Sequence, residues 1–325
     1  MRTRACDLLR IEHPVALGGM AGVTAARLVA AVSNAGGLGT LGCANQAPAW
    51  ITAAAREVRE KTDRPFALNL LLFLADEPSI GAVLEAKPPV FSTSWPPGGY
   101  DLKALFARAH DAGSKVMHMV STVAEARRAA EAGADLVVAQ GSEGGGHVGL
   151  IGTITLVPMV VRAVTPLPVL AAGGIATGEG LAAALALGAD GVLLGTRFLA
   201  TEESPLPDAF QRAILASDGH NTLLTEIPDV ARGRVWPGAF SRVARNRFIE
   251  RWAGREGELR ARQPEAAAAL QRAVAAGDAE EAALFMGQDA GLIETIEPAA
   301  DVLRRIVAEA EQILGRLGKN MAGSR

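Results

Sequence analysis

The chain of 325 residues contains very little cysteine, with only Cys6 and Cys43. These two residues match neither a metal-ligand spacing nor a disulfide framework, so we expect a reducing, cytoplasmic location and no metal site. No apolar segment follows the first few residues, and no run reaches the ~18 uninterrupted apolar residues of a membrane span. We therefore expect neither a signal peptide nor a membrane-spanning helix.

An excess of positive charge is also missing, because 32 Lys and Arg stand against 35 Asp and Glu and the net charge is −3. This balance gives no basic footprint for nucleic acid and no polybasic patch for a membrane. Hydrophobic residues, in contrast, make up 49% of the chain and charged residues 21%. Such a composition supports a large buried core and excludes a disordered chain.

One junction recurs along the chain, in which an alanine-rich helical segment is followed by glycine and then by a short apolar strand. The glycines of these junctions are Gly36, Gly113, Gly133 and Gly188. Glycine is favoured just past the C-terminus of a helix because it enters the left-handed region without a Cβ penalty. The starts of helices are marked as well, by Thr24, Thr122 and Thr177, and Thr122 with Glu125 fits a capping box.

Eight segments between these helices read as continuous apolar runs, which is typical of strands buried on both faces of a parallel sheet. They are Val15–Gly18, Leu38–Leu41, Phe66–Leu71, Val90–Thr93, Val116–Val120, Leu136–Ala139, Val169–Ala172 and Gly191–Leu194. Eight strands alternating with helices predict a (β/α)8 barrel of the α/β class. If Val90–Thr93 were not a strand, the remaining seven would favour an open, doubly wound sheet instead.

The pattern predicts three parts. Residues 1–201 form the barrel, and residues 202–297 form a smaller, mainly helical accessory domain with helices at 264–276 and 278–286 and no strand. Residues 298–325 form a C-terminal helix and a tail. Apolar residues fall on one face of the segment 299–318, so we expect this helix to pack on the barrel or on a second copy of the chain in a homodimer.

In a barrel, functional residues gather at the C-terminal ends of the strands. Gly173 and Gly174 follow the seventh predicted strand, and Gly195 and Thr196 follow the eighth. These are the two positions where barrels commonly bind a phosphate, and the helix that begins near Thr177 would add its positive end. The glycines alone do not distinguish FMN from a sugar phosphate.

His147 follows three glycines beyond the sixth predicted strand, so we interpret it as a mouth residue that acts as a general base or donates a hydrogen bond to an anion. His118 lies within an apolar strand, where it is either a core histidine or part of the active site. We take His118 and Ser142 as candidate substrate contacts. Glu143 is either an anchor of its loop or an acid.

The residues 139–149 read AQGSEGGGHVG and resemble the Q-G-x-E-A-G-G-H-x-G signature of the nitronate monooxygenase family. The segments 169–175 and 188–199 resemble two further signatures of that family, and 30–39 matches as well. The resemblance covers most of residues 10–204. Two departures are that Gly144 replaces the usual alanine and that Met20 lacks the preceding proline.

The resemblance implies a TIM barrel that binds FMN without a covalent bond, with His147 as the catalytic residue. It implies phosphate contacts from Gly173, Gly174, Gly195 and Thr196. It implies contacts to the isoalloxazine ring from Gly19, Met20, Asn69 and Gln140, with Gly145 and Gly146 nearby. Ala21 and Ala172 complete the expected cofactor-binding set.

The activity that the resemblance implies is oxidation of alkyl nitronates by FMN and O2 to a carbonyl compound and nitrite. The expected partners are therefore a small-molecule substrate and O2. The alternative is NAD(P)H-driven reduction of a quinone or an enoyl thioester on the same FMN, because such reductases are related. A third possibility, from a different functional class, is a barrel that holds no flavin and binds a phosphosugar.

Overall fold

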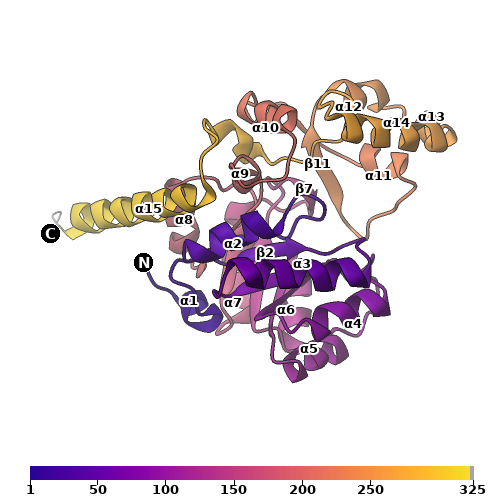
Figure 1. Ribbon diagram of the computed structural model, residues 1–325. Coiled ribbons are helices and arrows are strands. Elements are labelled where there is room, and N and C mark those ends of the chain that lie inside the picture. Colours follow the sequence, from indigo (N-terminus) through magenta and orange to yellow (C-terminus); the bar gives the residue numbers. More distant parts are fainter. Residues whose placement is uncertain (323–325) are drawn as a thin grey trace.

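The computed structural model describes residues 1–322, and its centre is a barrel of eight parallel strands (Figure 1). The strands are β1 (Val15–Leu17), β2 (Gly39–Gly42), β3 (Phe66–Leu71), β4 (Val90–Ser94), β5 (Lys115–Val120), β6 (Leu136–Gln140), β8 (Val169–Ala172) and β9 (Gly191–Leu194). Their spatial order is β1-β9-β8-β6-β5-β4-β3-β2, and a parallel bridge between Ala16 and Leu38 closes the ring. The predicted TIM barrel and its eight strands are confirmed, Val90–Thr93 included.

Helices alternate with the strands and cover the outside of the barrel. They are α2 (Ala26–Asn34), α3 (Pro48–Lys61), α4 (Glu77–Glu85), α5 (Leu102–Asp111), α6 (Val123–Glu131), α7 (Thr153–Val164) and α8 (Gly178–Ala186). A further helix, α1 (Arg4–Leu9), buries Cys6 and Leu9 against interior strand residues such as Ala16 and Leu38. Leu38 directly precedes β2, and most of the other barrel residues in this cluster, such as Val90 and Leu136, lie at the starts of their strands, so α1 closes the end of the barrel opposite the C-terminal mouth.

The helix ends follow the sequence pattern closely. Gly36, Gly113, Gly133 and Gly188 have φ of 90°, 87°, 98° and 93°. The capping box of Thr122 and Glu125 is also formed. Thr24, in contrast, does not cap α2, because its hydroxyl donates to Met20 O at 2.9 Å and accepts from Gly42 N at 2.8 Å. Thr24 therefore fastens the loop after β1 to the end of β2.

The accessory region contains strands that we did not predict. β10 (Thr222–Thr225) pairs antiparallel with β11 (Phe240–Ala244), and β11 pairs with β7 (Gly146–Val148), which follows β6. The expectation of no strand in 202–297 is therefore wrong. The third strand of this sheet is β7, which belongs to the loop after β6. It lies outside residues 202–297, the segment in which we looked for strands.

The short helix α9 (Thr196–Leu199) directly precedes this region, whose other elements are mostly short helices. They are α10 (Asp208–Leu215), α11 (Ile227–Ala231), α12 (Arg247–Trp252), α13 (Glu256–Ala261), α14 (Gln263–Ala276) and the 3-10 helix η1 (Gln288–Leu292). The helix predicted at 264–276 is present as α14. The helix predicted at 278–286 is absent, because Gly277 ends α14 in the left-handed region and Phe285 forms a β-bridge to Val243.

The C-terminal helix α15 (Ala299–Ala322) packs against α8 and α2, and its far end extends away from the body of the molecule (Figure 1). The contact with α8 is close, because a Cβ on Gly178 would lie 2.3 Å from Glu309 Cβ. Within residues 1–322, no helix is both long and apolar enough to cross a membrane.

Candidate active site

The C-terminal mouth of the barrel presents backbone rather than bulky side chains where β8 ends. Gly173 and Gly174 have φ of 95° and 74°, which only glycine adopts readily. A Cβ on Gly173 would lie 2.6 Å from Gly141 O, and one on Gly174 would lie 2.9 Å from Glu143 Cβ. Both glycines are therefore required by the conformation of this turn and by the loop after β6, whatever ligand binds.

Gly195 differs from these two because its surroundings are open. It has an ordinary negative φ, and the one heavy atom within 4 Å of a Cβ placed there is Met20 Sδ, at 3.5 Å. Gly195 is the N-cap of the short helix α9, whose first residue is Thr196. This geometry leaves open space beside the backbone where α9 begins, so a phosphate can approach the chain closely there.

The expectation that α8 points its positive end at the phosphate is wrong. The N–H of Gly178, the first residue of α8, donates to Glu309 Oε2 at 3.2 Å. The end of α8 is thus occupied by the carboxylate from α15, and α9 is the helix that begins at the mouth. The hydroxyl of Thr196 is also engaged, because it accepts from Gly287 N at 2.9 Å.

Polar side chains without partners face the inside of the barrel near the same mouth. Side chains alternate between the two faces of a strand, so residues two or four positions apart share a face. Thr40 lies two residues after Leu38, Ser94 lies four after Val90 and Gln140 lies two after Val138. Leu38, Val90 and Val138 are buried in the barrel interior, so Thr40, Ser94 and Gln140 are on the interior face as well. Thr40 Oγ1, Ser94 Oγ and Gln140 Oε1 are buried and make no hydrogen bond within the described residues. Buried polar atoms are normally satisfied, so these three favour a polar ligand at the mouth.

The loop after β1 completes this part of the mouth. A Cβ on Gly19 would lie 2.4 Å from Asn69 Cβ, so Gly19 packs directly on the Asn69 side chain. The Asn69 amide donates to Ser92 Oγ at 3.0 Å. Met20 is half-buried and Ala21 is exposed beside a bridge to Gly42. The expected cofactor-binding residues on β1, β3 and β6 therefore lie around one mouth.

The glycine-rich loop after β6 is held from two sides. Glu143 accepts from Thr153 N at 2.9 and 3.0 Å, so its carboxylate caps the start of α7 and acts as a loop anchor. A Cβ on Gly145 would lie 2.5 Å from Met286 C, so this glycine is required by the segment before η1. Ser142 contributes its carbonyl, which accepts from Arg242 Nε at 2.8 Å.

His147 lies on β7 and is bound by two residues of the accessory region. Its Nε2 lies 2.9 and 3.0 Å from the carboxylate oxygens of Asp229, and 3.0 Å from Ser241 Oγ. The Ser241 hydroxyl donates to Asp229 Oδ2 at 2.7 Å. Asp229 and Ser241 are both buried, so this network is rigidly placed.

Two aromatic rings enclose the His147 imidazole. Trp236 stacks on it with centroids 3.3 Å apart and planes inclined by 12°, and Phe285 lies 5.7 Å away. Burial lowers the pKa of His147 below its usual value, partly offset by Asp229, and the positive charges of Arg232 and Arg234 lower it further. His147 is therefore neutral at physiological pH and able to accept a proton.

His118 is not placed with His147. It alternates with Met117 and Met119 on β5, and its ring packs on Phe106 of α5 at 5.6 Å. Its Nδ1 lies 2.7 Å from Thr93 Oγ1, and burial lowers its pKa to about 3. These contacts are those of a core histidine between the barrel wall and a helix, and the substrate contact that we expected for His118 stays a prediction.

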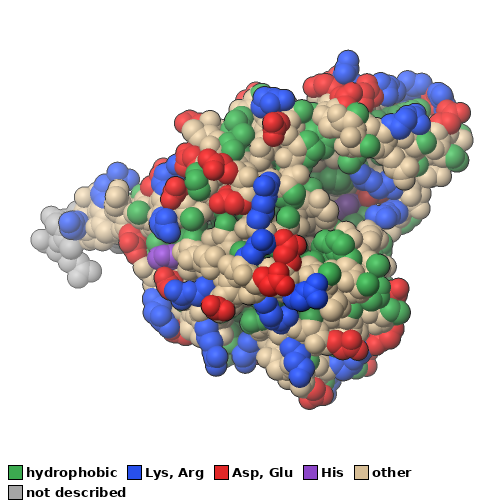
Figure 2. Space-filling view, in the orientation of Figure 1, with side chains coloured by type: hydrophobic (Ala, Val, Ile, Leu, Met, Phe, Trp, Pro, Cys, Tyr) green, Lys and Arg blue, Asp and Glu red, His purple; other side chains and the backbone are tan. Residues whose placement is uncertain are grey.

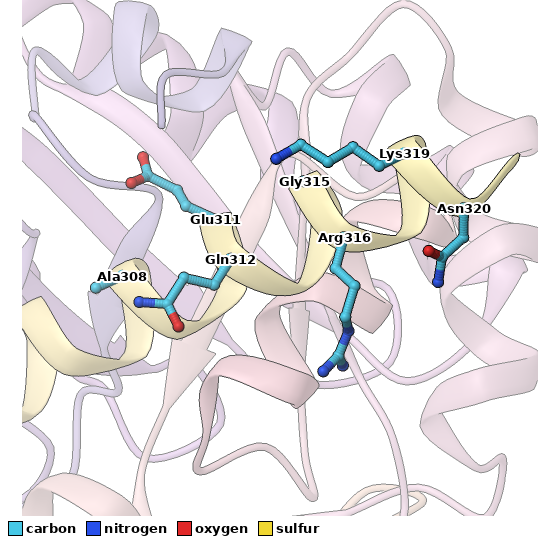
Figure 3. Close-up of a pocket in the computed structure, with 7 residues that line it drawn as sticks. All are labelled: Ala308, Glu311, Gln312, Gly315, Arg316, Lys319 and Asn320. Atoms are coloured by element: carbon cyan, nitrogen blue, oxygen red, sulfur yellow. The ribbon is translucent and has the colours of Figure 1, made fainter. Parts of the chain in front are cut away.

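A small cavity of about 60 Å³ does lie next to this part of the mouth. Its lining residues include His118, Ser121, Gln140 and Pro237. A second depression is lined entirely by residues of α15, including Glu311 and Arg316 (Figure 3). Because one helix supplies every residue there, this depression is an open helix face, and it brings together none of the residues considered above.

Sequence reasoning missed Asp229, Ser241 and Trp236. All three lie beyond residues 10–204, which the resemblance covers. Nothing in the local sequence around Asp229 or Trp236 distinguishes them from other residues of a helical region. They become functional candidates only because β11 pairs with β7 and brings Ser241 opposite His147.

Comparison with known proteins agrees with this geometry. The family model described as nitronate monooxygenase matches residues 2–86 and 79–309. A (3aS,4S,5R,7aS)-5-hydroxy-7a-methyl-1-oxo-octahydro-1H-indene-4-carboxyl-CoA dehydrogenase of Mycobacterium tuberculosis is 40% identical over 254 residues, covering 77% of this chain and 68% of that protein.

Two further similarities extend over nearly the whole chain. A probable nitronate monooxygenase of Staphylococcus aureus is 30% identical over 362 residues, covering 96% of this chain and 98% of that protein. The structure of FabK from Thermotoga maritima superposes with a TM-score of 0.89 at 36% identity, covering 98% of this chain and 99% of that chain. The accessory region and α15 therefore belong to the same shared architecture as the barrel.

Proposed function

This chain belongs to the nitronate monooxygenase family and is an oxidoreductase, and on that premise we propose that it binds FMN and oxidises alkyl nitronates with O2 to a carbonyl compound and nitrite. The observation that carries the proposal is the position of His147. His147, held by Asp229, lies on β7 in the segment that directly follows β6, and the last residue of β6, Gln140, carries one of the unpartnered polar atoms at the barrel mouth.

The residues at the mouth fit FMN. The open space at Gly195 and the turn at Gly173 and Gly174 together make one phosphate cradle, and the chain has no G-x-G-x-x-G fingerprint opening its first β–α unit. One cradle suits a mononucleotide better than FAD or NAD. Gln140, Thr40 and Ser94 offer buried polar atoms for the ring system. FMN would supply the electron-accepting chemistry that the side chains lack.

The protein's own part in the reaction is to place the substrate and move a proton. A carboxylate only accepts hydrogen bonds, so Asp229 fixes the proton of His147 on Nε2 and leaves the lone pair on Nδ1. Nδ1 can then remove the carbon proton of a neutral nitroalkane. Trp236 and Phe285 exclude water from one side of the ring.

The proposal is tested by two measurements on the purified protein. Oxygen consumption and nitrite release are measured with ethyl nitronate as substrate, and we expect nitrite to be released as O2 is consumed. Flavin released by heating is identified by chromatography, and we expect FMN. Recovery of FAD, or of no flavin, contradicts the cofactor assignment, and a flavoprotein that forms no nitrite contradicts the substrate.

A second candidate is oxidation or reduction of a thioester on the same cofactor, with NAD(P)H as donor in the reductive direction. It is supported by the mycobacterial relative, which is named as a carboxyl-CoA dehydrogenase. This chain is 40% identical to that relative and 30% identical to the staphylococcal one. The carbon next to a thioester carbonyl is also a weak carbon acid, so His147 would play the same part. Consumption of NADPH with an enoyl-CoA, measured beside the nitronate assay, separates the two candidates.

A further inference from the structure

The loop 232–239 carries two arginines to the mouth. It follows α11, which bears Asp229, and leads into β11, which bears Ser241. Trp236, in the middle of this loop, stacks on His147. The loop therefore lies directly against the catalytic candidate, and Arg232 and Arg234 are at the start of it.

Arg232 lies close to His147, with one aromatic ring between them. The guanidinium of Arg232 lies 5.4 Å from the centre of the Phe285 ring, and that ring lies 5.7 Å from the His147 ring. Arg234 stands two residues further along the same loop, two residues before Trp236, which stacks on His147, and both arginines are half-buried. Figure 2 shows Lys and Arg side chains (blue) next to a histidine (purple) in a hollow between the barrel and the accessory region.

Neither arginine forms an ion pair with another residue of 1–322. The negative charge of Asp229 acts on Arg232, but the carboxylate oxygens of Asp229 already bind His147 and Ser241. Arg242, a third arginine of this region, is satisfied by Ser142 O and Thr222 Oγ1. The guanidinium nitrogens of Arg232 and Arg234 are not among the buried unpartnered atoms of the described residues, so their donors stay accessible to an anion that arrives from outside.

We propose that Arg232 and Arg234 bind a phosphate group of a phosphorylated substrate or electron donor whose reactive end reaches His147. Two planar guanidinium groups match the charge and the several oxygens of a phosphate, whereas a nitronate carries one charge. The cradle for the FMN phosphate lies at Gly173 and Gly195, on other loops. The inference goes beyond the proposed function, because a simple alkyl nitronate has no phosphate.

The same chemistry is present in coenzyme A and in NADPH, so both serve as probes. Each is titrated into the flavin-loaded protein by calorimetry, with ethyl nitronate as a probe that lacks phosphate. The variants are Arg232→Gln, Arg234→Gln and the double variant. Arg272→Gln on α14 is the matched control, because it removes one exposed arginine of the same region.

We expect each single variant to weaken binding of at least one phosphorylated probe by about tenfold or more, and the double variant by more than either. Arg272→Gln and ethyl nitronate affinity should be unchanged. Loss for coenzyme A alone identifies a thioester carrier as the source of the phosphate, loss for NADPH alone identifies the electron donor, and loss for both identifies a shared subsite.

Unchanged affinity in the double variant overturns the proposal, as does wild-type protein that binds neither probe. An equal loss in Arg272→Gln would show that net charge is responsible. Release of flavin from the double variant would place the arginines at the cofactor instead. Calorimetry needs no turnover, so failure of the nitronate assay leaves this result independent of the proposed function.

Discussion

His147 Nε2 lies 2.9 Å from Oδ1 and 3.0 Å from Oδ2 of Asp229, two residues that are 82 positions apart in the chain. The carboxylate fixes the imidazole proton on Nε2, so Nδ1 carries the lone pair and is the nitrogen to which the proposed mechanism assigns proton transfer. The barrel alone does not create this arrangement. It depends on the pairing of β7 with β11, which joins the mouth loop to the accessory region.

Asp229→Asn tests the role of this carboxylate. An asparagine amide can donate to Nε2 and move the proton to Nδ1, so we expect turnover of neutral nitroethane to fall by about 10²–10⁴-fold. Preformed ethyl nitronate needs no proton removal and should be affected much less. Rates for both substrate forms, with flavin content as the control, decide the matter, and equal losses for the two forms contradict a role in proton transfer.

The pH dependence provides a second measure of the same pair. A base must be neutral, so activity on nitroethane is present above the pKa of His147 and is lost as the pH falls through it. Burial places this pKa below the usual 6.5. Since Asp229 raises the pKa, the residual activity of Asp229→Asn should show its acidic limb at lower pH than wild type. A limb that moves to higher pH would contradict this assignment.

His147→Ala should keep the fold and the flavin and lose turnover. Removal of a proton-transfer group costs about 10²–10⁴-fold in rate, and the loss should be larger with the nitroalkane than with the nitronate. If His147 only binds the anion, both forms should suffer through a higher KM. Loss of flavin together with activity would instead show that the ring serves to fasten the loop Gly144–Gly146.

Trp236→Leu should raise the pKa of His147 toward its ordinary value, because burial is the largest cause that lowers it and Trp236 supplies the stacked ring. The acidic limb of the pH–rate profile should therefore move to higher pH. Val235→Leu, at an exposed neighbouring position of the same loop, is the matched control. An unchanged limb would show that other groups keep water from the imidazole.

Gly195→Val should give folded protein without flavin. A Cβ on Gly195 would have Met20 Sδ, at 3.5 Å, as its one neighbour within 4 Å, and the added atoms would fill the open space beside the backbone at the start of α9. Gly174→Val is a less selective test, because a φ of 74° and a Cβ contact of 2.9 Å with Glu143 strain the fold itself. Thermal unfolding and flavin absorbance of Gly195→Val are measured together, and full flavin content would place the phosphate elsewhere.

His118 should affect stability rather than catalysis. Its pKa is lowered to about 3 in the folded protein, so unfolding takes up a proton below the ordinary value of 6.5. The resulting stability is complete above about pH 6.5 and declines as the pH falls, by up to about 2 kcal/mol at pH 5. Urea unfolding of wild type and His118→Gln at pH 7 and 5 should show a smaller loss on acidification in the variant.

The barrel could be predicted because its signals are local. Each strand is a short apolar run, and the glycines after α2, α5, α6 and α8 occupy the left-handed positions that end those helices. The family signatures likewise lie on single loops. Gly145 shows the limit of such reasoning, since its nearest neighbour is Met286, in a segment that the local pattern predicted to be helical.

The part of the site in the accessory region, with Asp229 and Ser241, could not be predicted because it depends on contacts between distant segments. Asp229 lies on a helix of five residues, and Ser241 lies on a strand that exists only through its partners β10 and β7. His118 illustrates the converse. Its strand was predicted correctly, but whether a residue on a barrel strand faces the interior or the helices depends on a register that the apolar run did not specify.

The central claim is that this mouth binds a flavin that accepts electrons from a nitronate. It is tested most directly by mixing the purified yellow protein with ethyl nitronate in the absence of oxygen, with NADH and NADPH as parallel additions. We predict that the nitronate abolishes the yellow colour and that admission of O2 restores it with release of nitrite. A protein isolated without flavin, or one whose colour persists with the nitronate and is lost with NADH or NADPH, would contradict the account.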